Sequence, residues 1–117
     1  MSLETNLYAA LSGLCDRVYP DIAPNNTSLP YITWSQVGGD VLQPLANQLA
    51  DKRNARVQVN VWAKTRAEAV ELMLDSEQAL IESEDFIAVQ QGAAVSSYSE
   101  DDDIRGMFQL FSIWADR

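Results

Sequence analysis

The sequence predicts an α+β domain in which two helices pack on one face of an antiparallel sheet of four to five strands. An uninterrupted alternation of apolar and polar residues over 55–64 indicates a half-buried strand. The capping box Thr65-Arg66-Ala67-Glu68 follows at once and begins a helix. Apolar residues at three- and four-residue steps near the N-terminus indicate a second helix. Strands joined by tight turns favour antiparallel pairing, so the expected order is helix, strand, long loop, strand, helix, strand, strand.

The length of the chain predicts a single domain over residues 1–117. A chain of 117 residues has the commonest domain size, and a hydrophobic content of 47% supplies a core without metals or disulfides. No apolar run approaches the roughly 20 residues that span a bilayer. The first residues carry no basic region, so we expect the protein in the cytosol rather than secreted.

The charge and the rare residue types exclude most enzyme classes. The chain has no histidine, which removes the usual general base and the commonest zinc ligand. Its one cysteine, Cys15, is expected to be a buried packing residue, because only Arg17 is near enough in sequence to activate a thiol. The net charge of −9 opposes binding to phosphate backbones and anionic membranes. We therefore expect no catalytic residue, cofactor or metal, and a protein that binds other proteins.

The first third of the chain is expected to hold a helix, a connection and a strand. Three prolines make 18–30 an ordered connection, because each removes a backbone donor and restricts the residue before it. Aromatic and β-branched residues make Tyr31–Val37 a strand. The apolar stripe of the helix is Leu3, Leu7, Ala10, Leu11, Leu14 and Val18.

A long polar segment between the first two predicted strands is expected to be a mobile loop at about 38–54. It begins with Gly38, Gly39 and Asp40, and loops of this length are usually functional or disordered. The competing prediction is a short helical turn around 45–49. A basic cluster at its end is either solvated or pairs with an acidic neighbouring subunit; its members are Lys52, Arg53 and Arg56.

The second half of the chain predicts a helix and a hairpin. The helix should end near Ser83–Asp85 and bury one face, made of Val70, Met73, Leu74, Leu80 and Ile81. Residues 86–98 and 107–115 should be the two strands of the hairpin. The acidic run Ser99–Asp103 between them is read as a solvated tip rather than a site for a hard cation, because it lacks the alternating ligand spacing of a calcium loop.

The predicted sheet carries more apolar surface than one buried face needs. If Val57, Val59 and Val61 face the helices, then Trp62 points away from them. The last strand is apolar on both sides, with Met107, Phe111 and Ile113 in one row and Phe108, Leu110 and Trp114 in the other. An exposed row of this kind marks an interface. The alternatives are that the first helix crosses to that side, or that the sheet curves onto itself.

Several short blocks of the sequence resemble the small tail-completion proteins of long-tailed bacteriophages and prophages, which are tail terminators or head–tail joining proteins. The most specific block is the valine-rich strand Arg56–Thr65 running into Ala67-Glu68-Ala69. The others, in chain order, are Tyr19-Pro20-Asp21 with Ala23-Pro24, Leu29-Pro30-Tyr31, Val37-Gly38-Gly39 and Phe111-Ser112-Ile113-Trp114. The resemblance covers nearly the whole chain.

The resemblance implies a non-enzymatic virion protein that forms a hexameric ring on the head-proximal end of the tail tube. Its partners would be other copies of itself, the tail tube protein and the head connector protein, and assembly would take place in the bacterial cytoplasm. From the residues themselves, the candidate interface comprises Gly38, Gly39, Asp40, Lys52, Arg53, Arg56, Trp62 and Trp114. The alternatives are a small acidic adaptor or inhibitor module and, more remotely, a carboxylate-based hydrolase.

Overall fold

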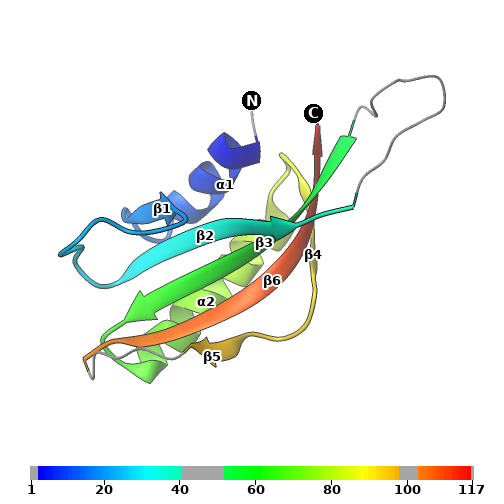
Figure 1. The fold of residues 1–117 in the computed structure, drawn as a ribbon. Helices are drawn as coiled ribbons and strands as arrows, with labels where there is room; N and C mark the ends of the chain where they lie inside the picture. Colours follow the sequence, from blue (N-terminus) through cyan, green and yellow to red (C-terminus); the bar gives the residue numbers. More distant parts are fainter. Residues whose placement is uncertain (1–2, 41–51, 98–102, 117) are drawn as a thin grey trace, which may run out of the picture.

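The computed structural model describes residues 3–40, 52–97 and 103–116. They form two layers, with two helices behind a twisted sheet (Figure 1), which confirms the α+β class. No helix in these ranges is both long and apolar enough to cross a membrane. In chain order the elements are α1 (Leu3–Ser12), β1 (Val18–Pro20), β2 (Tyr31–Gly38), β3 (Lys52–Ala63), α2 (Arg66–Glu82), β4 (Ile87–Gln90), β5 (Val95–Ser97) and β6 (Arg105–Asp116).

The sheet is mixed and six-stranded, so the expectation of four to five antiparallel strands is wrong. The strands lie in the order β1-β2-β3-β6-β4, and β5 also pairs with β6. All pairs are antiparallel except β1 and β2, which run parallel with Val18 opposite Ile32. β1 falls within 18–30, where a connection was expected. It has only three residues and ends at Pro20, so it is too short for its sequence to show an alternation.

Both edges of the sheet are short. β1 forms one edge, and the other edge is divided between β4 and β5, which pair with different parts of β6. The strand expected over 86–98 is therefore interrupted. Gly92, with a φ of 104°, turns the chain between the two pieces, and the Gln91 N–H still donates to the Leu110 carbonyl at 2.9 Å.

The helix α1 is shorter than its apolar stripe suggested. It ends at Ser12, so Leu14 lies beyond it with 38% of its surface exposed, and Val18 belongs to β1. The side chains of Leu3, Leu7 and Leu11 are buried, as expected. α1 lies beside α2 and β1 on the same side of the sheet (Figure 1).

The helix α2 begins and ends where the sequence predicts. The hydroxyl oxygen of Thr65 accepts the backbone N–H of Glu68 at 3.1 Å, and Ser83 is the C-cap.

The buried face of α2 differs from the prediction at three positions, one of which is Val70, which is only partly buried and outside the core cluster. Leu74 and Ile81 were expected in the core, but 56% and 45% of their surfaces are exposed. Small residues contribute to the buried face instead: Ala69 and Ser76 are fully buried together with Met73 and Leu80. The Ser76 hydroxyl donates to the Leu72 carbonyl at 2.8 Å, so its burial leaves no unmet hydrogen bond.

The core lies between α2, α1 and the strands β2, β3 and β6. The alternation over 55–63 is confirmed, since the side chains of Ala55, Val57, Val59, Val61 and Ala63 have no exposed surface. Phe111 and Ile113 of β6 lie in the same layer, as their predicted row requires. Trp34 also joins this core and is 7% exposed, so it is a packing residue of the protomer.

The long loop has narrower bounds than expected. Gly38 ends β2, and Lys52, Arg53 and Asn54 begin β3, where they pair with residues 114–116. Pairing with the end of β6 extends β3 into a polar run that has no strand pattern of its own. The middle of the predicted loop and the competing helical turn fall on 41–51, outside the described residues. Most of the predicted hairpin tip falls on 98–102, which is also outside them.

Candidate functional site

The face of the sheet away from the helices is the candidate functional site, and we call it the open face. No described helix covers it (Figure 1). Along each strand, residues of the open face alternate with residues of the core, which confirms that the sheet has a second apolar face. Its large side chains on the central strands are half-buried by their neighbours; they are Trp62, Phe108, Leu110 and Trp114.

Trp62 lies at one end of the open face, where its indole packs against residues of the two neighbouring strands. It pairs with Tyr31 on one side and with Gly106 on the other. The two aromatic ring centroids are 6.5 Å apart with the planes inclined at 33°. A Cβ atom at Gly106 would lie 2.5 Å from two carbons of the indole, so glycine is what lets the indole lie over β6. Burial in this group raises the pKa of the Tyr31 phenol above its ordinary value.

The rest of the open face carries apolar side chains along β6 and its edge strands, interrupted by Ser112 and by the hydrogen bond from Arg56 to Gln91. Trp114 pairs with Ile87, and Phe108 pairs with Val95. The aliphatic side chains of the edge strands are the most exposed, with 67% of Ile87, 50% of Val89 and 48% of Val95 accessible. We call this surface the apolar strip; it comprises Ile87, Val89, Val95, Phe108, Leu110 and Trp114.

A polar band on β3 flanks the apolar strip, and it is nearly free of acidic groups. Among the paired strand positions of the open face, the charged residues are Lys52, Arg56 and Asp116. Lys52 and Asp116 form an ion pair, which lowers the pKa of the Asp116 carboxyl. The Nε of Arg56 donates to the Gln91 side-chain oxygen at 2.9 Å and to no carboxylate of the described residues. A chain with a net charge of −9 therefore presents a face that is apolar and slightly cationic.

A model of one protein family matches residues 4–116, nearly the whole chain, and its description is tail completion protein gp17. The chain belongs to the tail completion protein gp17 family. This membership confirms the resemblance that the sequence blocks suggested and makes the chain a structural protein of phage tail assembly.

A solved structure supports the same fold for this tail completion protein. A chain of the virion of a native gene transfer agent particle is similar to it over 99% of the present chain and 96% of its own, with a TM-score of 0.66. The two chains are 17% identical, so the likeness extends to the fold. No curated protein sequence matches the chain.

The glycine-rich residues of the predicted interface lie where β2 ends. Gly39 has a φ of 153°, and a Cβ there would lie 2.5 Å from the Asn54 carbonyl oxygen, so the position requires glycine. The Asp40 N–H donates to the Asn54 side-chain oxygen at 2.8 Å. Gly38 and Asp40 are exposed at the end of β2, away from Trp62 at the other end of the sheet.

The basic cluster of this tail completion protein is divided between the two faces. Lys52 and Arg56 occupy open-face positions, whereas Arg53 alternates to the other side and donates to the Gln36 side-chain oxygen at 3.4 Å. Since Lys52 is already paired with Asp116, Arg56 is the cation best placed to meet an external carboxylate.

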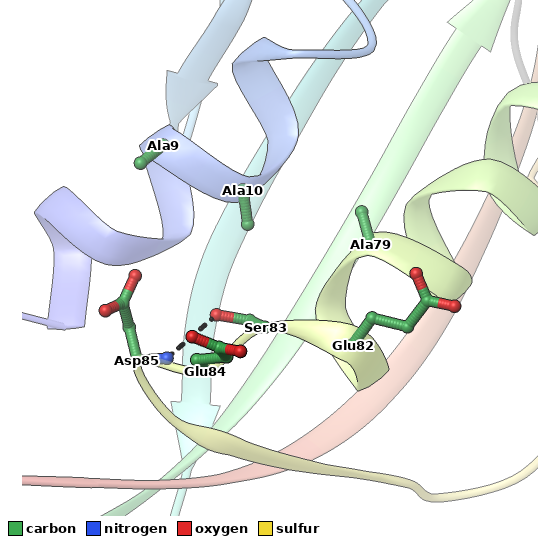
Figure 2. A pocket seen from close by; sticks show the side chains of 7 residues that line it. All are labelled: Ala9, Ala10, Ala79, Glu82, Ser83, Glu84 and Asp85. Carbon is green, nitrogen blue, oxygen red and sulfur yellow. Dashed lines mark hydrogen bonds between the residues drawn. The ribbon is translucent and has the colours of Figure 1, made fainter.

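A hollow of about 360 Å³ between α1 and the end of α2 is the place where carboxylates gather (Figure 2). Its walls are Ala9, Ala10 and Ala79 with Ser83, and Glu82 points away from Glu84 and Asp85. All three carboxylates are exposed to solvent. Such a hollow gives no support to the hydrolase alternative, which needs a converging pair. In the described parts of the chain, no group of three or more acidic or cysteine side chains could hold a metal ion.

Two sets of surface residues were missed by the sequence reasoning. Residues 86–98 were predicted only as one strand of a hairpin, although Ile87 and Val89 alternate with smaller residues as in a strand with one apolar side. Leu74 and Ile81 were assigned to the core, although their seven-residue spacing also fits a separate line along the helix. Nothing in the sequence marks Gly106 as the residue beneath an indole.

Proposed function

We propose that this protein is a ring-forming tail terminator or head–tail joining protein that caps the head-proximal end of the tail tube. Membership of the tail completion family supports a structural role in tail assembly. The observation that carries the ring is the apolar strip, because a monomer has no use for an uncovered row of aromatic and aliphatic side chains on a sheet. Its neighbours in the virion would be further copies of itself, the tail tube protein and the head connector protein.

Six copies in a closed ring would each use two different surfaces, one for each neighbour. The open face, which contains Trp62 and Trp114, supplies one of these surfaces. The segment between β2 and β3 would contact the next ring. Any residue that this contact fixes would cost roughly 1–2 kcal/mol, which the contacts made there must exceed.

The acidic character of the chain suits a ring through which DNA passes. A net charge of −9 on every subunit would repel the phosphate backbone and keep it from adhering to the lumen. Micromolar DNA binding by the assembled ring that does not weaken with salt would contradict this part of the proposal.

Electron microscopy of tail tubes tests the proposed function. Purified tubes that lack a terminator are mixed with the protein, and the tube ends are classified. We expect a ring at one end of each tube and none along its length. Binding along the whole tube, or no binding to tubes together with a tight one-to-one complex with a cytosolic protein, would favour the adaptor alternative.

A further inference from the structure

The outward flank of α2 carries an apolar line that the protomer does not use. Leu74 is 56% exposed and Ile81 is 45% exposed. Ala67, which is also exposed, precedes Leu74 by the same seven residues, so the three side chains lie in one line along the helix. A hollow of about 520 Å³ opens beside this line, with Ala67, Val70 and Leu74 among its walls. The helix α2 lies on the side of the sheet away from the open face (Figure 1), so the exposed apolar side chains of its flank form a second apolar surface.

The charges of the two surfaces are opposite. α2 carries five carboxylates and one cation, Arg66. Glu71, Asp75 and Arg66 line the hollow beside Leu74, so two of its three charged groups are acidic. Among the described residues of the open face, the acidic group is paired with Lys52, and Arg56 lies beside the apolar strip without a carboxylate partner. A surface that is apolar and acidic complements one that is apolar and cationic.

We propose that the outward flank of α2 in one copy of this chain docks on the apolar strip of the next copy. The contact places Leu74 and Ile81 against the exposed aliphatic residues of β4 and β5, and it brings Glu71 or Asp75 towards Arg56. This inference rests on the proposed ring and names the two surfaces that close it.

A head-to-tail contact explains both surfaces, whereas a symmetric one does not. If two apolar strips met face to face, Arg56 would approach its own copy and the apolar line of α2 would remain uncovered. A contact between unlike surfaces buries both and repeats from copy to copy, and it generates a ring when the rotation between neighbouring copies closes.

Charged substitutions at exposed positions test the assignment. Leu74→Lys and Val89→Glu each place a charge in the proposed contact, and both side chains are at least half exposed, so folding should be unaffected. We expect each variant to cap about tenfold fewer tube ends than the unmodified protein at the same concentration, since a buried unpaired charge weakens association. The matched control is Ile22→Glu, which changes an aliphatic residue that is 81% exposed and lies on neither surface.

Cross-linking on the tubes distinguishes the two geometries. Leu74→Cys and Val89→Cys proteins with different tags are mixed, capped onto tubes and treated with a short bifunctional maleimide. We expect a product that joins the two tags, and no product from either variant alone. A product from Val89→Cys alone would indicate strip-on-strip contact and overturn the proposal.

The ring and its contact surfaces can fail separately. If the unmodified protein does not cap tubes, the proposed function is wrong. If it caps them and both Leu74→Lys and Val89→Glu cap equally well, the ring stands and the docking assignment is wrong. Unchanged circular dichroism spectra of the variants ensure that a loss of capping reports the contact rather than unfolding.

Discussion

Replacing Gly106 with alanine should destabilise the protein mainly through a contact with Trp62, and to a smaller extent through a 3.2 Å approach to the Cβ of Ser97. The new Cβ would lie 2.5 Å from the Cε3 and Cζ3 atoms of Trp62, about 1 Å closer than an ordinary carbon contact. The indole cannot yield freely, because the ring of Tyr31 lies on its other side with a centroid separation of 6.5 Å. Overpacking of this kind costs about 1–3 kcal/mol, so we expect the free energy of unfolding to fall by about 2 kcal/mol.

A double-mutant cycle isolates this contact. Urea denaturation followed by circular dichroism gives the unfolding free energy of Gly106→Ala, Trp62→Val and the double variant. In the Trp62→Val background the alanine should cost less than about 1 kcal/mol, because the two indole atoms are absent and only the 3.2 Å approach to the Ser97 Cβ remains. The matched control is Gly13→Ala, since a Cβ at Gly13 meets no atom within 4 Å. An equal cost of Gly106→Ala in both backgrounds would refute the reasoning.

Three further changes test other parts of the structure. Thr65→Ala removes the oxygen that caps α2 and should lower the unfolding free energy by about 1 kcal/mol, while Thr65→Ser should retain most of it. The side-chain oxygen of Gln109 is buried without a partner among the described residues, whereas its Nε2 donates to the Gly92 carbonyl at 3.0 Å. Gln109→Met removes both the unpaired oxygen and this hydrogen bond, so the two effects should largely offset and the unfolding free energy should change by less than about 1 kcal/mol. A loss of more than about 2 kcal/mol would mean that the unpaired oxygen does not offset the bond to Gly92. Burial raises the pKa of Tyr31, so the folded state holds its proton more tightly than the unfolded state. The contribution of Tyr31 to the free energy of unfolding is therefore fully present below the ordinary pKa near 10. It is lost as the pH rises through the pKa of the folded state. Tyr31→Phe should remove this loss, and Trp62→Ala should return the pKa, measured by NMR, towards its ordinary value.

The parts of the fold that could be predicted from the sequence are those with a regular pattern over many residues. The alternation over 55–63 fixed both the strand and its buried face, because a period of two survives any tertiary arrangement that covers one side. The capping box placed the start of α2 because the Thr65 bond is made within four residues. The two apolar rows of β6 likewise revealed the open face before its surroundings were known.

The predictions from the sequence were wrong where tertiary contacts determine the secondary structure or the burial of a residue. Three residues are enough for β1 because β2 supplies the pairing partners, and no local signal shows this. The strand β3 reaches back to Lys52 because β6 continues opposite to it. Leu74 was assigned to the core because leucine is usually buried, but the small Ser76 occupies the buried line instead. Part of the candidate site was therefore predicted from the sequence. Its two tryptophans were identified, and the exposed side chains of β4 and β5 were not.

The brevity of the outermost strands has a consequence for how subunits can add to one another. A long unpaired edge strand can pair with strands of further molecules without limit, and such pairing leads to fibrils. Here one margin is three residues ending in a proline, and the other is broken at Gly92. Polymerisation through intermolecular backbone hydrogen bonds is therefore disfavoured at both edges of the sheet. Side-chain contacts between layers remain available for assembly, and these can be satisfied by a fixed number of copies.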